Sequence, residues 1–219
     1  AFLDEVRAKR GNPALVESFR NTVEANRKQA VEHLNDDHLC FPSLYVLREE
    51  ITKAHLLDQL CDRVRGTLNF LNEKNPDQDA GMQTHPTALK WMIKTGGQDN
   101  IDHDYLKKLD MASALLISVH GDRSTLPAIV EMIFYRCRNG LPYHDLIWAI
   151  LESRDPYILT LVAGRLVSSD KRERDCAYKL LGFIPGIDRK KTFDGGKHYE
   201  IFCEWIEENG PFLWYKGET

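Results

Sequence analysis

The sequence predicts an all-α protein, with an N-terminal helical hairpin or small bundle followed by a short solenoid of stacked helix pairs. Apolar residues recur at intervals of three or four along most of the 219 residues, which is the period of an amphipathic helix. Alternating runs of β-branched residues, which would indicate strands, are absent. Glycine, proline, asparagine and aspartate interrupt the helical pattern at short, regular intervals in the second half, as expected for paired helices.

The composition is typical of a soluble globular protein, with 42% hydrophobic and 28% charged residues. The formal net charge of -4 provides no overall attraction for nucleic acid or an anionic membrane, although a local basic patch remains compatible with it. No run approaches the ~20 apolar residues that a membrane span needs. Charged residues follow directly after Phe2 and Leu3, so we expect no signal peptide. Because the chain begins at Ala1 without methionine, we expect a segment of a longer protein, with a processed N-terminus as the alternative.

The cysteines predict a reducing compartment. Their number is odd, their spacings are wide and no Cys-x-x-Cys pair occurs, which differs from the disulfide framework of a small secreted domain. The five residues are Cys40, Cys61, Cys137, Cys176 and Cys203. We therefore expect free thiols and a cytoplasmic location.

Two long helices are predicted in the N-terminal part. The first begins at Asn12-Pro13, an N-cap residue followed by the proline that favours the first helical position, and ends at the polar residues 35–37. The second covers residues 42–71, where apolar positions step by three or four throughout. We expect the two to pack as an antiparallel hairpin, with a coiled-coil partner as the alternative.

A domain boundary is predicted near residue 97. Residues 75–84 are polar and aperiodic, so they form the expected loop. A short helix follows from Pro86 and stops at Gly96-Gly97. This divides the chain into an N-terminal helical region, residues 1–97, and a second helical region, residues 98–219. One continuous helical domain is the alternative.

The second region is predicted to hold six shorter helices. Asp170 and Glu173 have the spacing of a capping box, which marks the start of the fifth. The first three expected helices cover residues 105–119, 124–137 and 142–151. The fourth begins at residue 156, the fifth begins at residue 170, and the sixth lies within residues 195–209.

Residues 124–153 and 155–185 read as two similar helix pairs, and such pairs bury their apolar faces by stacking. The second pair resembles a HEAT repeat through Asp170, Arg174, Ala177, Leu181, Gly182 and Ile184, and the first through Leu126-Pro127. The resemblance covers residues 124–185. It implies an α-solenoid that binds proteins, and it implies no catalytic residues.

One group of residues could be read as a metal site. His33, His38 and Cys40 gather with acidic residues at the end of the first predicted helix. Their spacing matches no standard zinc module, so a polar helix terminus is the alternative interpretation.

Two acid–histidine neighbours and one glycine pair are further candidates for chemistry. Residues 102–104 and 144–145 place histidine beside aspartate, but adjacent helical residues point in different directions. Acids at a helix start are also favoured by the macrodipole alone. Gly195-Gly196-Lys197 lacks the rest of a phosphate-binding loop. We therefore expect no catalytic residue, no cofactor and no metal ligand.

The basic residues are concentrated in two short segments. Lys171, Arg172 and Arg174 lie in the first and residues 189–191 in the second. They could contact a phosphate backbone. Acidic residues are interspersed among them, which favours a solvated turn instead.

The function that the sequence favours is that of a non-catalytic protein-binding scaffold within a larger intracellular protein. The predicted partner-binding residues are Lys171, Arg172, Arg174, Tyr178, Trp205 and Trp214. One alternative is a nucleic-acid-binding HEAT-like protein such as a DNA glycosylase, which the net charge disfavours. A second alternative is a metal-dependent enzyme that uses His33, His38 and Cys40.

Overall fold

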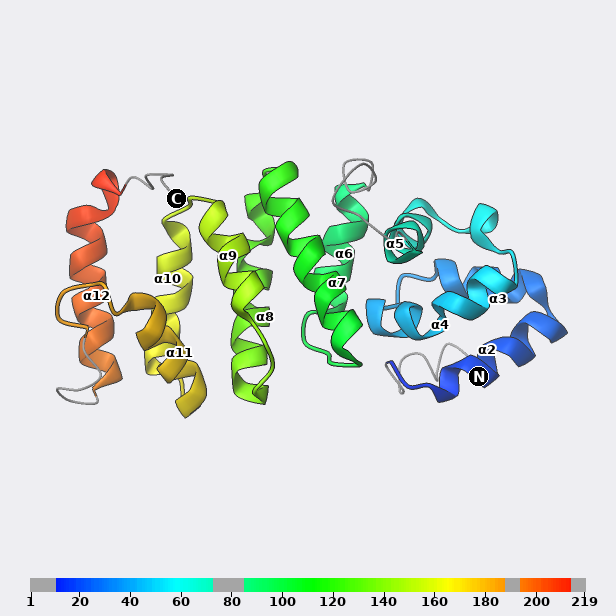
Figure 1. The fold of residues 1–219 in the computed structure, drawn as a ribbon, viewed down its shortest axis with the longest axis horizontal. Coiled ribbons are helices and arrows are strands. Elements are labelled where there is room, and N and C mark those ends of the chain that lie inside the picture. The colour runs from blue at the N-terminus through cyan, green and yellow to red at the C-terminus, as the bar shows by residue number, and fades with distance from the viewer. Residues whose placement is uncertain (1–10, 73–84, 188–193, 214–219) are drawn as a thin grey trace. The chain divides into compact units, whose positions relative to one another are not determined.

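The structure is a computed structural model that describes residues 11–72, 85–187 and 194–213. These residues form α-helices joined by short 3-10 and π turns and contain no strand, which confirms the predicted all-α class (Figure 1). Two compact units are present, residues 1–120 (unit 1) and 121–219 (unit 2). The division differs from the boundary predicted near residue 97, because the helix that follows this residue packs within unit 1. No described helix combines the length and hydropathy that crossing a membrane would require.

Unit 1 is a bundle of short helices. Its core comprises α4, α5, α6 and α7, since α6 packs against each of the other three, and α2 packs against α3 and α4. The described helices are α2 (Ala14–Ala25), α3 (Arg27–Asn35), α4 (Phe41–Lys53), α5 (Asp62–Asn72), α6 (Pro86–Gly96) and α7 (His103–Ala114), which continues into a π turn, Leu115–Val119.

Both long helices predicted for unit 1 are broken, so these two predictions were wrong. In the first, Asn26 adopts an extended backbone and its side chain accepts a hydrogen bond from Gln29 N, which caps α3. In the second, α4 ends at Lys53 and His55 lies in the left-handed region at φ 50. The apolar period nevertheless continues, because Leu56 in the break is fully buried.

An aromatic cluster joins α4 to α7 in unit 1. The ring of Phe41 stacks on Tyr105 with centroids 5.0 Å apart, and Tyr45 meets Tyr105 edge-on at 5.1 Å. The Tyr105 hydroxyl donates to the carbonyl oxygen of Gly96 at the end of α6, 2.8 Å away. A Cβ atom at Gly96 would lie 2.5 Å from this hydroxyl and 2.6 Å from Cδ1 of Phe41. The cluster therefore requires a residue without a side chain at position 96.

Replacement of Gly96 by alanine should destabilise the protein by about 1–3 kcal/mol, because the added methyl group overpacks this cluster. Chemical denaturation followed by circular dichroism measures the change. Gly164→Ala is the control, since Gly164 has helical dihedral angles and no atom lies within 4 Å of the position of a Cβ. Equal unfolding free energies for Gly96→Ala and the wild type would contradict this account.

Unit 2 is built on α8. This helix packs against α9, α10 and α11, while α12 packs against the turn that follows α10. The elements are α8 (Leu126–Asn139), α9 (His144–Glu152), α10 (Tyr157–Ala163), the 3-10 turn η4 (Gly164–Val167), α11 (Lys171–Leu181) and α12 (Gly195–Asn209). They agree closely with the predicted helices. The HEAT-like solenoid itself stays a prediction.

The start of α11 confirms one predicted cap and corrects another. The Asp170 side chain accepts hydrogen bonds from the backbone N–H groups of Arg172 and Glu173, at 2.7 and 3.1 Å. The reciprocal bond of a capping box is absent from this turn, since the Asp170 N–H donates to Ser168 Oγ at 3.1 Å. The Glu173 carboxylate is instead directed to arginines of other elements.

Candidate functional site

An ion-pair network around the buried Glu173 joins α8, η4 and α11 of unit 2. The Glu173 side chain on α11 is 3% exposed and pairs with Arg138 of α8 and with Arg165 of η4, the latter at 3.6 Å. The Ser168 hydroxyl donates to the same carboxylate at 2.5 Å. Arg165 also pairs with Glu131 of α8. These charges are directed at one another, so the network stabilises the fold and offers no vacant group for catalysis.

Two of the three predicted basic residues of α11 donate to backbone carbonyl groups. Arg172 Nη1 donates to the carbonyl oxygen of Arg138 at 2.6 Å. Arg174 Nη1 donates to the carbonyl oxygens of residues 168 and 169, each at 2.7 Å. Lys171 is exposed, and residues 189–191 lie outside the described residues. The two arginines thus help to hold the ends of α8 and η4, and their role in binding a partner stays a prediction.

The three aromatic residues predicted to bind a partner lie in different environments. Tyr178 is buried, and its hydroxyl forms a 2.7 Å hydrogen bond with Nδ1 of the buried His198. This contact joins α11 to α12, and the buried Tyr178 side chain is not accessible to a partner at the surface. Trp205 is half-buried on α12, and Trp214 lies outside the described residues.

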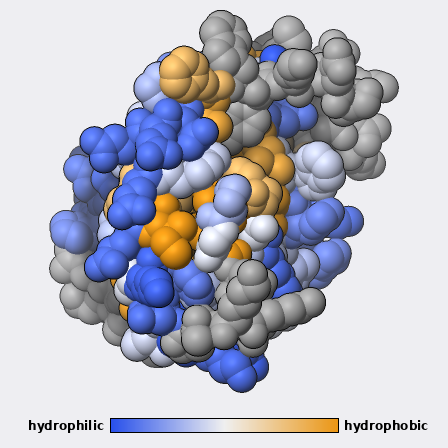
Figure 2. Space-filling model, turned by 90° about the vertical axis from the view of Figure 1, so that its left-hand side faces the viewer, coloured by the Kyte–Doolittle hydropathy of each residue, from blue (hydrophilic) through white to orange (hydrophobic). Residues whose placement is uncertain are grey.

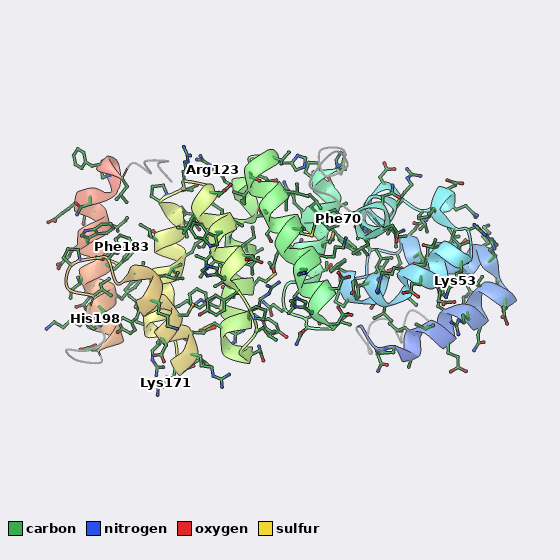
Figure 3. All side chains as sticks on the ribbon, viewed as in Figure 1. Lys53, Phe70, Arg123, Lys171, Phe183 and His198 are labelled. Atoms are coloured by element: carbon green, nitrogen blue, oxygen red, sulfur yellow. The ribbon has the colours of Figure 1, made fainter. Side chains whose placement is uncertain are left out.

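Trp205 forms an apolar surface with a residue that sequence reasoning missed. Phe183 follows α11, is 62% exposed, and meets Trp205 edge-on with ring centroids 6.0 Å apart. Ile201 lies one turn before Trp205 on α12 and is half-buried. Phe183, Ile201 and Trp205 are called the α12 face below. Figure 2 shows apolar residues gathered on this end of unit 2 between hydrophilic ones, and Figure 3 shows Phe183 beside α12.

Exposed apolar side chains are concentrated in unit 2. Among the described residues, the large exposed apolar side chains of unit 2 are Trp148, Leu151, Tyr157, Val167, Phe183, Tyr199 and Phe212. The described part of unit 1 contributes Val119 alone, so every aromatic member of this set belongs to unit 2. Single exposed apolar residues are common, but an exposed aromatic side chain in contact with a second one, as Phe183 is with Trp205, favours a binding surface.

The histidine considered for catalysis on α9 belongs to another exposed aromatic pair. Trp148 Nε1 donates to His144 Nε2 at 3.0 Å, and the two rings meet edge-on. The imidazole is therefore directed to the indole one turn along the helix. This arrangement favours a surface role for His144 over that of a general base.

The acidic residues before α7 cap this helix. Asp102 accepts a hydrogen bond from the backbone N–H of Tyr105 at 2.7 Å and another from the Tyr45 hydroxyl at 2.9 Å. Burial of Tyr45, together with its hydrogen bond to Asp102, raises the pKa of the phenol. This favours the helix-start interpretation of residues 102–104.

The structure does not support the proposed metal site. His38 Nδ1 lies 2.8 Å from Asp36 Oδ1, while Cys40 is buried with its Sγ 3.3 Å from Ser43 Oγ. In the described part of the chain, no three His, Cys, Asp or Glu side chains gather as potential metal ligands.

A shallow pocket of about 170 Å³ lies between α2 and α4 of unit 1. Its charged residues neutralise one another, since Glu50 binds Arg20 at 2.7 Å and Lys53 at 2.9 Å. Hydrogen bonds from Arg20 and Lys53 lower the pKa of Glu50 to about 2. The Glu50 carboxyl group is therefore ionised near neutral pH and is a poor general base.

A thiol pair lies between α8 and α11. Cys137 Sγ donates to the carbonyl oxygen of Arg172 at 3.2 Å, one helical turn before Cys176. Burial, followed by the interaction with Cys137, raises the pKa of the Cys176 thiol to about 12. Only a small fraction of Cys176 is therefore thiolate at neutral pH.

Iodoacetamide at pH 8 should label Cys203 of the folded protein much faster than Cys176. Cys203 is exposed, whereas Cys176 is buried with a raised pKa, and the thiolate is the reactive form. Peptide mass mapping over a time course measures both rates, and labelling in denaturant controls for intrinsic reactivity. Equal rates in the folded protein would contradict this prediction.

Comparison with protein-family models, curated proteins and solved structures gives no match.

Proposed function

We propose that this chain is a non-catalytic protein-binding region, in which unit 2 presents the α12 face to a partner. The observation that carries the proposal is the concentration of exposed aromatic side chains in unit 2. Aromatic residues dominate the binding energy of many protein interfaces, since they bury a large area at a small cost in side-chain entropy. The HEAT-like stacking of residues 124–185, the scaffold role and a cytoplasmic location belong to the same proposal.

The way in which α12 is held in unit 2 supports this function. The first residue of α12, Gly195, approaches η4 so closely that a Cβ atom would lie 2.3 Å from the carbonyl oxygen of Leu166. Phe202 is buried, and His198 pairs with Tyr178 of α11. A surface held in this way loses little conformational entropy when a partner binds.

Nucleic-acid binding receives less support from unit 2. Arg138 and Arg165 pair with the Glu173 carboxylate, and Arg172 donates to a backbone carbonyl group. These contacts engage three arginines of unit 2, and the net charge of -4 provides no overall attraction for phosphate groups. Enzymatic function receives no support from the clusters described above.

Selection from a random peptide library displayed on phage tests the proposal. The wild-type protein should enrich peptides whose affinity falls at least about tenfold on Phe183→Ala, since this change removes an exposed aromatic anchor. Val119→Ala is the matched control, because Val119 is an exposed apolar residue of unit 1. Its affinities should equal those of the wild type.

Two results of the selection would count against the proposed function. One is a failure to enrich any peptide above a matrix without protein. The other is a set of peptides that bind Phe183→Ala and the wild type equally well.

A further inference from the structure

The solvent side of α12 is rich in negative charge. Glu200, Glu204, Glu207 and Glu208 are all exposed, and Lys197 is the only lysine or arginine in the helix. None of the four carboxylates pairs with another described residue. This helix therefore presents a strongly acidic surface next to the α12 face.

The arrangement of these glutamates is unfavourable for an isolated helix. Glu204 and Glu208 are four residues apart, as are Glu200 and Glu204, and like charges at this spacing repel each other. Glu207 and Glu208 also lie in the last turn, where the helix dipole is negative and no basic residue compensates. A cationic partner would relieve both effects.

The acidic residues border the apolar ones directly. Glu204 lies three residues after Ile201, and Glu208 lies three residues after Trp205, so both carboxylates project beside the apolar side chains on the helix surface. The α12 face and this acidic border together form one amphipathic surface. Figure 2 shows hydrophilic residues next to the apolar ones on this end of unit 2.

We propose that the α12 face binds a basic amphipathic segment of a partner protein. Apolar side chains of the segment pack against Phe183 and Trp205, and its lysine or arginine side chains lie opposite Glu204 and Glu208. This inference rests on the proposed function and names the chemistry of the partner. Electrostatic complementarity of this kind increases the association rate and discriminates against acidic partners.

Charge complementarity selects this occupant over others. In a symmetric pair of identical chains, each α12 face would meet its own copy, so the glutamates of one chain would oppose those of the other. Nucleic acid and anionic lipid surfaces would be repelled by the same carboxylates.

Binding of two designed peptides tests the inference. Both are fluorescent helical probes with leucine and tryptophan on one face, and the remaining positions are lysine in one and glutamate in the other. At low salt, fluorescence anisotropy should show that the wild type binds the lysine probe at least about tenfold more tightly than the glutamate probe. Added salt should reduce this preference, since exposed charges are screened.

Charge-reversed variants provide the decisive comparison. E204K/E208K should lose at least about tenfold in affinity for the lysine probe. E49K/E152K changes the net charge by the same amount at exposed positions outside α12, and should lose less than about threefold. Circular dichroism verifies that each variant is folded.

The inference is overturned if the two probes bind the wild type equally, if neither binds, or if the two charge-reversed variants behave alike. Failure of the inference is distinguishable from failure of the proposed function. If the library selection returns neutral or acidic peptides that depend on Phe183, the protein-binding role is supported while the basic partner is excluded.

Discussion

Glu173 lies at the junction of three elements of unit 2, and its buried carboxylate interacts with Arg138 on α8, Arg165 in η4 and the Ser168 hydroxyl. A buried carboxylate is costly unless its charge is paired and its oxygen atoms accept hydrogen bonds. Removal of this carboxylate would leave the half-buried Arg138 and Arg165 without their charge partner and should destabilise unit 2. The Glu173 carboxylate therefore helps to hold α11 against α8, together with the hydrogen bond from Arg172 to the carbonyl oxygen of Arg138.

The proposed binding surface depends on α11 in turn. Tyr178 reaches from α11 to His198 on α12, and Phe183 follows directly after α11 to meet Trp205. The α12 face therefore combines Phe183, which follows α11, with residues of α12. The buried contact between Tyr178 and His198 fixes the two helices relative to each other. This arrangement explains how a small unit can expose aromatic side chains and still hold them in a fixed geometry. A preorganised surface of this kind is the structural requirement for the proposed function.

Local features of the fold were predictable from the sequence, and long-range ones were not. The helical period indicated the all-α class, and Asp170 was identified as a helix cap because both of its acceptor contacts lie within three residues. Glu173 matched a local capping box, whereas its actual partner Arg138 lies 35 residues away. His55 breaks a helix without interrupting the apolar period. Phe183 is exposed because of the way the chain packs after α11. The residues next to Phe183 in the sequence do not indicate this packing.

Hydrogen–deuterium exchange on Glu173→Gln tests the central role of this carboxylate most directly. The account predicts faster amide exchange throughout α8, α11 and α12, with unchanged exchange in the helices of unit 1, since local stability depends on the contacts of each region. Glu152→Gln, at an exposed position on α9, should exchange like the wild type. Unchanged protection of α11 and α12 in Glu173→Gln would contradict the account.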